Sequence, residues 1–385
     1  MNWRQSWLVG VLFIISANTV AQTVILPENA RAGEAFPALM SLPQALALAD
    51  TGHPHLLKHA AQLQAEQALV KRPLPENYCR LEGVEGAQIS LDFAQRQQRI
   101  KIIKHFFGVL AADARFAADN EAMSLAFFPF SRAEERQQRF GSVSELEVME
   151  KRVAYFDELE IRNKSLRAQR SARLQLALAM ARPEARPDNL IEPDLFAYER
   201  EIPDYDDLLA QVLLRSPRLK QKALQLTQLE SLVRQMAGDE PCLLLALPAV
   251  GAAHKSGLSH AGTLLPGMRV NTIPIQRADL LALIEAKRAE SLALDFRLRE
   301  RVLTWVHKLE KLAQQIAQNA QNLEYRERAL DKSRLLYEME VQAQIGQAQA
   351  DMARLLWQDA QTKYKRAVIW ERIDAVLGAP EVRFE

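Results

Sequence analysis

The sequence has little glycine and few aromatic residues: 14 of its 385 residues are Gly, and Phe, Trp and Tyr together make up 7%. Ala, Leu, Gln, Glu, Arg and Lys dominate the stretches between the prolines. This composition is that of a long-helix protein rather than of a compact α/β domain. The sequence therefore indicates a mainly α-helical chain whose length allows two domains of ordinary size.

The sequence also lacks a strong charge of one sign, since its net charge is only +1. No basic field and no DNA-binding or RNA-binding motif is present, so we expect no nucleic-acid partner. A Gly-rich phosphate loop, a nucleophile elbow and a His-Glu-x-x-His motif are missing as well. We therefore predict that the protein is not an enzyme and has no catalytic residue and no cofactor.

No apolar run is long enough to be a transmembrane helix, which needs about 20 residues. The run from Trp7 to Ile15 follows Arg4 and precedes the small residues around Ala17 and Ala21. This pattern is typical of a secretory signal peptide rather than of a membrane anchor. No Cys lies near the expected cleavage site after Ala21, so a lipid anchor is not supported. We predict a signal peptide over 1–21, followed by an extended N-terminal segment over 22–40, and an exported mature chain.

What the sequence does contain is a repeat. Ser41–Val70 aligns without a gap on Asp204–Val233, and Phe140–Glu184 aligns on Tyr337–Glu381. A duplicated unit of this size predicts two structurally similar copies in a pseudo-symmetric arrangement. The first alignment contains these identical pairs: Leu46/Leu209, Ala47/Ala210, Pro54/Pro217, Leu56/Leu219, Ala60/Ala223, Gln62/Gln225, Leu63/Leu226, Leu69/Leu232 and Val70/Val233.

Each copy opens with a helix whose first residues carry a capping signal. Ser41 begins a Ser-x-x-Gln capping box, and Asp204 supplies a carboxylate suited to a helix N-terminus. Asp206 and Asp207 follow Asp204, and we interpret this group as a complement to the helix dipole rather than as a cation site. A proline thirteen residues after each start (Pro54 or Pro217) predicts a break before a second helix.

A β insert follows in each copy. We place the first repeat at 41–200 with an insert at about 73–93, and the second at 201–385 with an insert at about 241–276. Ala87–Phe93 alternates between apolar and polar residues, which predicts a strand in the first insert.

In the second insert, the runs Cys242–Leu247 and Met268–Ile275 predict two strands around a loop rich in Gly, Ser and His. Long return helices are then expected over Ala94–Phe140 and Arg277–Tyr337. The second of these carries apolar residues every seven positions, which predicts a left-handed coiled-coil seam with one wet face. The seam residues are Val302, Leu309, Ile316, Leu323, Leu330 and Tyr337.

The middle of the first copy contains a helix break. Gly141 is placed to end one helix, and Ser144-x-x-Glu147 is a capping box for the next. The aligned segment Tyr337–Glu340 has no glycine, so it can continue as helix. Cys79 and Cys242 occupy equivalent repeat positions, where they are either a disulfide or two small apolar residues at a helix-to-strand junction.

The order and spacing of these features form a known pattern. The stretches that carry it are Leu42–Ala49 with Pro54, Leu208–Pro217, Arg139–Glu150, Met180–Pro183 and Leu377–Pro380. Together with the duplication, they make the chain resemble the TolC-like outer membrane efflux protein family over nearly the whole mature chain.

The resemblance implies a mainly α fold, in which two tandem repeats of long coiled-coil helices form a helical barrel or shaft with short β-hairpin inserts. It implies a homotrimer that contributes helices to a periplasmic tunnel and strands to a barrel in the outer membrane. Such a protein is the exit duct of a tripartite efflux or export system, a passive conduit that works with a periplasmic adaptor and an inner-membrane pump. The implied location is the cell outer membrane with a periplasmic extension.

The first copy departs from this pattern. Its insert has room for only two very short strands, and its expected return helix is shorter than that of the second copy. The alternative is a periplasmic, non-conducting coiled-coil scaffold derived from the same fold.

Two groups of residues have the chemistry of an ion site. His53, His55 and His59 have metal-like spacing, but the aligned positions of the second copy carry Ser, Arg and Lys. We therefore interpret them as surface or capping histidines and predict no metal site. A second group either lines a tunnel that filters cations or forms a solvated helix face, which is the commoner outcome: Glu134, Glu135, Asp157, Glu158 and Glu160.

Overall fold

The structure is a computed structural model that consists mainly of long helices, which confirms the predicted fold class. The predicted signal peptide and residues 22–38 of the predicted extended segment lie outside the described residues. Among the helices that are described, none is both long and apolar enough to cross a lipid bilayer. The described residues are 39–49, 52–71, 78–80, 83–184, 186–236, 242–246, 260–265, 268–339 and 345–378.

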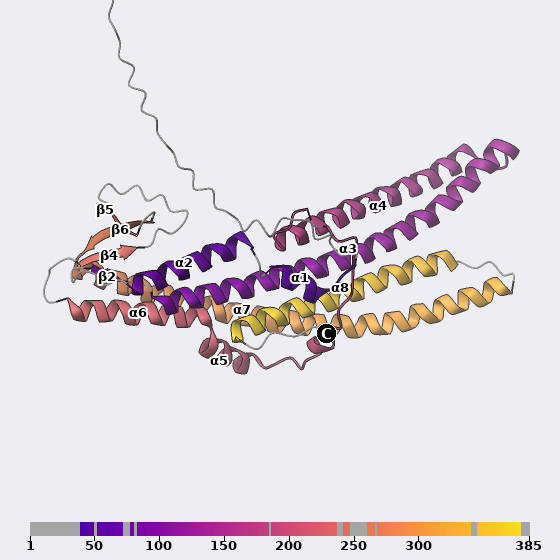
Figure 1. Cartoon of the computed structure of the whole chain (residues 1–385). Coiled ribbons are helices and arrows are strands. Elements are labelled where there is room, and N and C mark those ends of the chain that lie inside the picture. Colours follow the sequence, from indigo (N-terminus) through magenta and orange to yellow (C-terminus); the bar gives the residue numbers. More distant parts are fainter. Residues whose placement is uncertain are drawn as a thin grey trace, which may run out of the picture. The chain divides into compact units, whose positions relative to one another are not determined.

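The two copies have the same order of elements (Figure 1). The first copy contains α1 (Leu42–Ala49), α2 (Pro54–Val70), β2 (Tyr78–Arg80), α3 (Val84–Phe140) and α4 (Glu145–Ala179). The second contains α5 (Tyr205–Arg215), α6 (Pro217–Gln235), β4 (Cys242–Ala246), α7 (Arg277–Glu338) and α8 (Ile345–Leu377). The remaining elements are β1 (Leu39–Met40), β3 (Asn189–Leu190), the 3-10 helix η2 (Phe196–Tyr198), β5 (His260–Leu265) and β6 (Met268–Ile275).

The helices begin where the capping signals predict. The backbone N–H of Ser41 donates to Gln44 Oε1 (2.9 Å), and the N–H of Gln44 donates to Ser41 Oγ (3.4 Å), so the capping box is reciprocal. The carboxylate of Asp204 accepts from the N–H of Asp206 (2.9 Å). The second helix of each copy begins at the predicted proline, which lacks the N–H that a helix interior would need.

Strands from both copies share one sheet, whose order is β2-β4-β6-β5. β2 pairs with β4 in parallel, with Cys79 opposite Leu244, while β4 and β5 each pair with β6 in antiparallel fashion. The two predicted strands of the second insert are confirmed as β4 and β6, and β5 lies within the segment predicted as a loop. Cys79 and Cys242 thus lie on neighbouring strands, two positions out of register, and both alternatives, a disulfide or two small apolar residues, stay open.

The prediction of a strand over Ala87–Phe93 is wrong, because α3 begins at Val84 and includes this run. Ser90 Oγ accepts a hydrogen bond from Gln221 Nε2 of α6 (2.7 Å), and the Arg218 guanidinium lies over the Phe93 ring (4.5 Å). These contacts with α6 favour a helix over the strand that the alternating pattern predicted. The first insert is therefore shorter than 73–93, and the first return helix is longer than expected, with 57 residues against 62 in α7.

The helix break in the middle of the first copy is confirmed. Gly141 has φ 58°, and its N–H donates to the Gln137 carbonyl, while Ser144 Oγ accepts from the N–H of Glu147 (3.2 Å). The aligned segment of the second copy does not continue as helix, because α7 ends at Glu338 and Met339 is in a turn. No glycine marks this end in the sequence, which is why its position was missed.

The hydrophobic core lies where α8 packs against both α3 and α7, and where α1 and α5 cover the same helices. Its largest members from α3 are Phe106 and Phe107, which are 0% and 2% exposed. Trp305 of α7 and Trp370 of α8 belong to the same cluster. Burial of such side chains contributes about 1.5–3 kcal/mol each, so this cluster holds the two copies together.

The predicted seven-residue seam lies on the buried side of α7 near the core. Val302 and Leu309 are buried, whereas Ile316, Leu323 and Leu330 are half-buried. The predicted wet face is exposed at Gln314, Gln318 and Gln321. The seam thus packs tightly near the core and loosens toward the far end of the helix.

Candidate functional site

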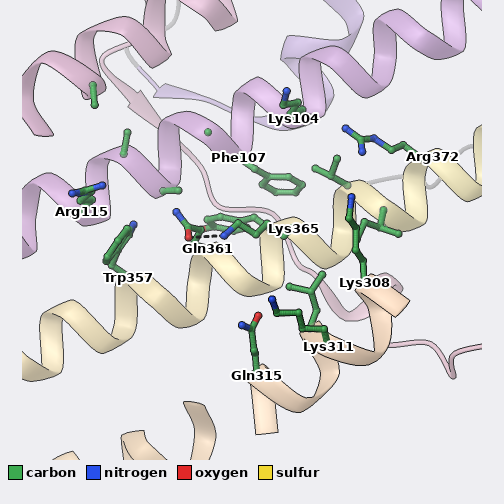
Figure 2. Close-up of a pocket in the computed structure, with 18 of the residues that line it drawn as sticks. Lys104, Phe107, Arg115, Lys308, Lys311, Gln315, Trp357, Gln361, Lys365 and Arg372 are labelled. Atoms are coloured by element: carbon green, nitrogen blue, oxygen red, sulfur yellow. Dashed lines mark hydrogen bonds between the residues drawn. The ribbon is translucent and has the colours of Figure 1, made fainter. Parts of the chain in front are cut away.

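A groove of about 680 Å³ lies mainly between α3, α7 and α8, with Ser165 and Ala168 of α4 also in its lining, in the part of the molecule that also holds the core (Figure 2). Small residues of α3, among them Gly108 and Ala111, form part of its lining. Its apolar side chains include Phe107, Leu312, Trp357, Tyr364, Val368 and Ile369. The rings of Phe107 and Tyr364 are stacked, with centroids 4.8 Å apart, so they form a rigid part of the wall.

Basic side chains surround this apolar surface, two from each of the three helices (Figure 2). None of the described residues that line the groove is an Asp or a Glu. Since the six residues come from three separate helices, no single stretch of the sequence reveals the cluster. The basic residues are Lys104 and Arg115 of α3, Lys308 and Lys311 of α7, and Lys365 and Arg372 of α8.

Two of these cations have partners nearby. Arg115 Nε lies 3.4 Å from Asp119 Oδ2, and its guanidinium lies over the Trp357 ring at 5.1 Å. Lys365 Nζ donates to Gln361 Oε1 (2.7 Å), an uncharged group. Lys104, Lys308, Lys311 and Arg372 form no ion pair with any residue that the structure describes.

A buried polar cluster lies on α8 outside the groove. Tyr198 of η2 donates its O–H to Glu371 Oε1 (2.7 Å), and Arg99 Nε lies 3.8 Å from Glu371 Oε2. Burial raises the pKa of Tyr198 and, together with the Glu371 charge, keeps the phenol protonated. Burial also raises the pKa of Glu371, against the opposing hydrogen bond from Tyr198 and the charge of Arg99. These residues join η2 and α3 to α8, so their role is structural.

The predicted histidine group is only partly brought together. The rings of His55 and His59 meet edge to face with centroids 5.0 Å apart, while His53 Nδ1 accepts from the backbone N–H of His55 (3.2 Å). Burial, followed by neighbouring positive charges, lowers the pKa of His53 and of His59. Within the described residues, no three His, Cys, Asp or Glu side chains are arranged to hold a metal ion.

The acidic residues that could line a tunnel belong to α3 and α4. Glu134 pairs with Arg152 (3.2 Å) and Glu135 with Arg139 (2.8 Å), so these two carboxylates are partly neutralised. Asp157, Glu158 and Glu160 lie on α4. Whether these five residues line a tunnel or form a solvated helix face, the two alternatives given by the sequence, is not decided by these contacts.

The end of the α3–α4 hairpin exposes apolar side chains. Phe140 and Leu146, on either side of the turn, are 74% and 76% exposed. Further along, Phe127, Phe130 and Tyr155 pack ring against ring, with Phe130 and Tyr155 stacked at 5.7 Å. Large exposed apolar residues close together are typical of surfaces that meet another protein.

Comparison with known proteins gives no match at the level of sequence: no family model and no curated protein is similar to this chain. Solved structures are similar in fold. A membrane protein from Pseudomonas aeruginosa has a TM-score of 0.58 at 13% identity, over 88% of this chain and 90% of its own. The CmeC outer membrane channel of Campylobacter jejuni has a TM-score of 0.57 at 13% identity, over 88% and 85%.

The MtrE outer membrane channel of Neisseria gonorrhoeae, in its open state, has a TM-score of 0.54 at 14% identity and covers 88% of this chain and 89% of its own. At these identities the similarity shows the fold alone. The repeat, the helix order and the extent of these matches agree, and the chain therefore has a divergent TolC-like fold.

Proposed function

We propose that this chain is an exit-duct component of a tripartite efflux or export system. It forms a homotrimer that acts as a passive conduit, exported to the cell outer membrane with a periplasmic extension. It works with a periplasmic adaptor and an inner-membrane pump. In this proposal the two copies, 41–200 and 201–385, each contribute one pair of long helices to the shaft.

The observation that carries the proposal is the extent of the structural match. The similarity covers 88% of this chain and between 85% and 90% of three membrane proteins, two of which are described as outer membrane channels. A single matched hairpin would support only a coiled coil, whereas coverage of both copies supports the complete architecture. The exposed apolar residues Phe140 and Leu146 support a protein partner at the end of the α3–α4 hairpin.

Fractionation of cells that produce the full chain, combined with the mass of the purified assembly, tests this proposal. We expect a trimer in the outer-membrane fraction that conducts ions after reconstitution into a planar bilayer. Recovery only as a soluble periplasmic protein would contradict the proposal and favour the non-conducting scaffold. A membrane-bound trimer without conductance would contradict the conduit while leaving the fold intact.

A further inference from the structure

Several cations of α7 have carboxylate partners, whereas the two that line the groove have none among the described residues. Elsewhere on α7, Lys287 and Arg288 pair with carboxylates, as do Arg299 and Arg326. Lys308 and Lys311 have no such partner among the described residues, and Glu310, between them in sequence, does not line the groove. Since the whole chain carries a net charge of only +1, the excess of positive charge in the groove is local to this site.

A neighbouring titratable group responds to the same field. Burial lowers the pKa of His105 on α3, and the charges of Lys104 and Lys101 lower it further. A hydrogen bond with Gln175 opposes this shift. Lys104 therefore adds to the cost of a positive charge on this part of α3, although burial is the larger cause of the shift.

The remaining surface of the groove is mostly apolar, with Ser165, Gln315 and Gln361 as its uncharged polar members. Trp357, Leu312 and Val368 contribute side chains from α7 and α8, and the stacked Phe107–Tyr364 pair closes one wall. The volume of about 680 Å³ lies within the range of small-molecule sites. Two carboxylates accept hydrogen bonds from lining residues, Glu192 from the Tyr364 O–H (2.6 Å) and Asp119 from Arg115 Nε (3.4 Å), and neither of them lines the groove.

We propose that this groove binds small amphipathic organic anions. The acidic group is held by the lysine and arginine side chains at the rim, and the apolar body lies against Trp357 and Val368. Charge-assisted contacts in a partly desolvated site give the selectivity for a negative group, and the apolar wall gives affinity for the rest of the molecule. All the residues that line the groove belong to one chain.

Equilibrium dialysis of the full-length protein against naphthalene-2-sulfonate tests this proposal. We expect saturable binding, with little binding of 2-naphthylmethylammonium, which has the same ring and the opposite charge. Lys308→Glu with Lys311→Glu should weaken binding at least about tenfold, because two favourable charges become repulsive. Gly108→Leu should also weaken it by filling the groove, since an added Cβ at Gly108 meets nothing within 4 Å.

The matched control is Arg136→Glu with Lys332→Glu, which reverses two exposed cations that are unpaired among the described residues and lie outside the groove. Its affinity should stay within about twofold of the wild type. Circular dichroism checks that each variant keeps its helices, and Gly108→Leu changes no charge. Equal binding of the two probes, unchanged affinity in both groove variants, or an equal loss in the control would each overturn the proposal.

Discussion

The two copies of the repeat agree where their helices begin and differ where the long hairpins end. In both copies a capped first helix is followed by a proline and a second helix. By contrast, Gly141 and Ser144 cap the α3–α4 turn, whereas α7 ends at Glu338 without such a signal. The first helices of both copies pack near the common core, whereas the ends of the long hairpins are exposed. Packing therefore constrains the sequence of the first helices and leaves the hairpin ends free to diverge.

A second comparison concerns the last helix of each copy. Ala181 and Gly378 occupy aligned positions, and both have a left-handed backbone, with φ 56° and 67°. In the first copy the N–H of Arg182 donates to the Ala177 carbonyl and that of Ala181 to the Leu178 carbonyl, as in a Schellman motif. The copies thus keep the same helix ending, although only one of them has the glycine that adopts it without strain.

The largest difference in stability is expected between alanine variants of two phenylalanines, one buried in the first return helix and one exposed in the second. Phe106 of α3 is 0% exposed, and Phe296 of α7 is 60% exposed. Phe106→Ala should lower the free energy of unfolding by about 3–5 kcal/mol, because it leaves a cavity in the core. Phe296→Ala should change it by no more than about 0.5 kcal/mol. Urea unfolding followed by circular dichroism measures both, and similar costs would show that Phe296 is buried in the assembled protein.

The next difference concerns the ion pairs that tie each hairpin. Arg173 makes two hydrogen bonds to Asp113 (2.7 and 3.0 Å) and donates to two backbone carbonyls, whereas Arg326 makes one bond to Asp351 (2.6 Å). Arg173→Met should therefore cost about 2 kcal/mol and Arg326→Met less than about 1 kcal/mol. Urea midpoints of the two variants test this order, and a larger effect at Arg326 would contradict it.

A smaller effect should appear at the two aligned helix ends. Ala181→Gly should raise the free energy of unfolding by about 1 kcal/mol, because it removes the strain of a left-handed Ala. Gly378→Ala should lower it by about the same amount or more, since the added Cβ would also lie 3.2 Å from Arg96 Nη1. Thermal unfolding of both variants checks that one gains stability and the other loses it. A change in the same direction in both variants would contradict the structural equivalence of these positions.

The smallest effect is a pH dependence from Glu371. Because its folded pKa is raised, the native state keeps this proton to a higher pH than the unfolded chain does. The stability it contributes is present below the ordinary glutamate pKa and is lost as pH rises through the folded pKa.

The unfolding free energy of the wild type relative to Glu371→Gln should therefore fall as the pH rises above the ordinary glutamate pKa. Burial also raises the pKa of Asp374, but this residue is present in both proteins, so its contribution to the difference largely cancels. Urea titrations at several pH values measure this difference. A difference that stays constant or rises with the pH above that pKa would contradict the assigned direction.

The helix starts were predictable because their signals are local. The Ser41–Gln44 and Ser144–Glu147 hydrogen bonds each join residues three apart, and a proline marks each second helix. The strand predicted over Ala87–Phe93 was wrong because its packing partner, α6, lies about 130 residues away and leaves no mark in the local pattern.

The candidate groove could not be predicted for the same reason. Lys308 and Lys311 are three residues apart on one helix, which by itself is an ordinary solvated face. Only the packing of α8 against both α3 and α7 brings them together with Lys104 and Arg372. The Tyr198–Glu371 hydrogen bond spans 173 residues and likewise has no local signal.

The pairing of β2 with β4 has a consequence for the order of folding. Tyr78 lies opposite Leu243, so the first copy's strand finds its parallel partner only after the whole α3–α4 hairpin has been added to the chain. Closing so long a loop is entropically costly, and such non-local pairings form late. Until then β2 has no partner strand among the described strands, and an unpaired strand is a site for incorrect association. The duplication that places the two copies in one chain therefore makes correct folding of the first depend on arrival of the second.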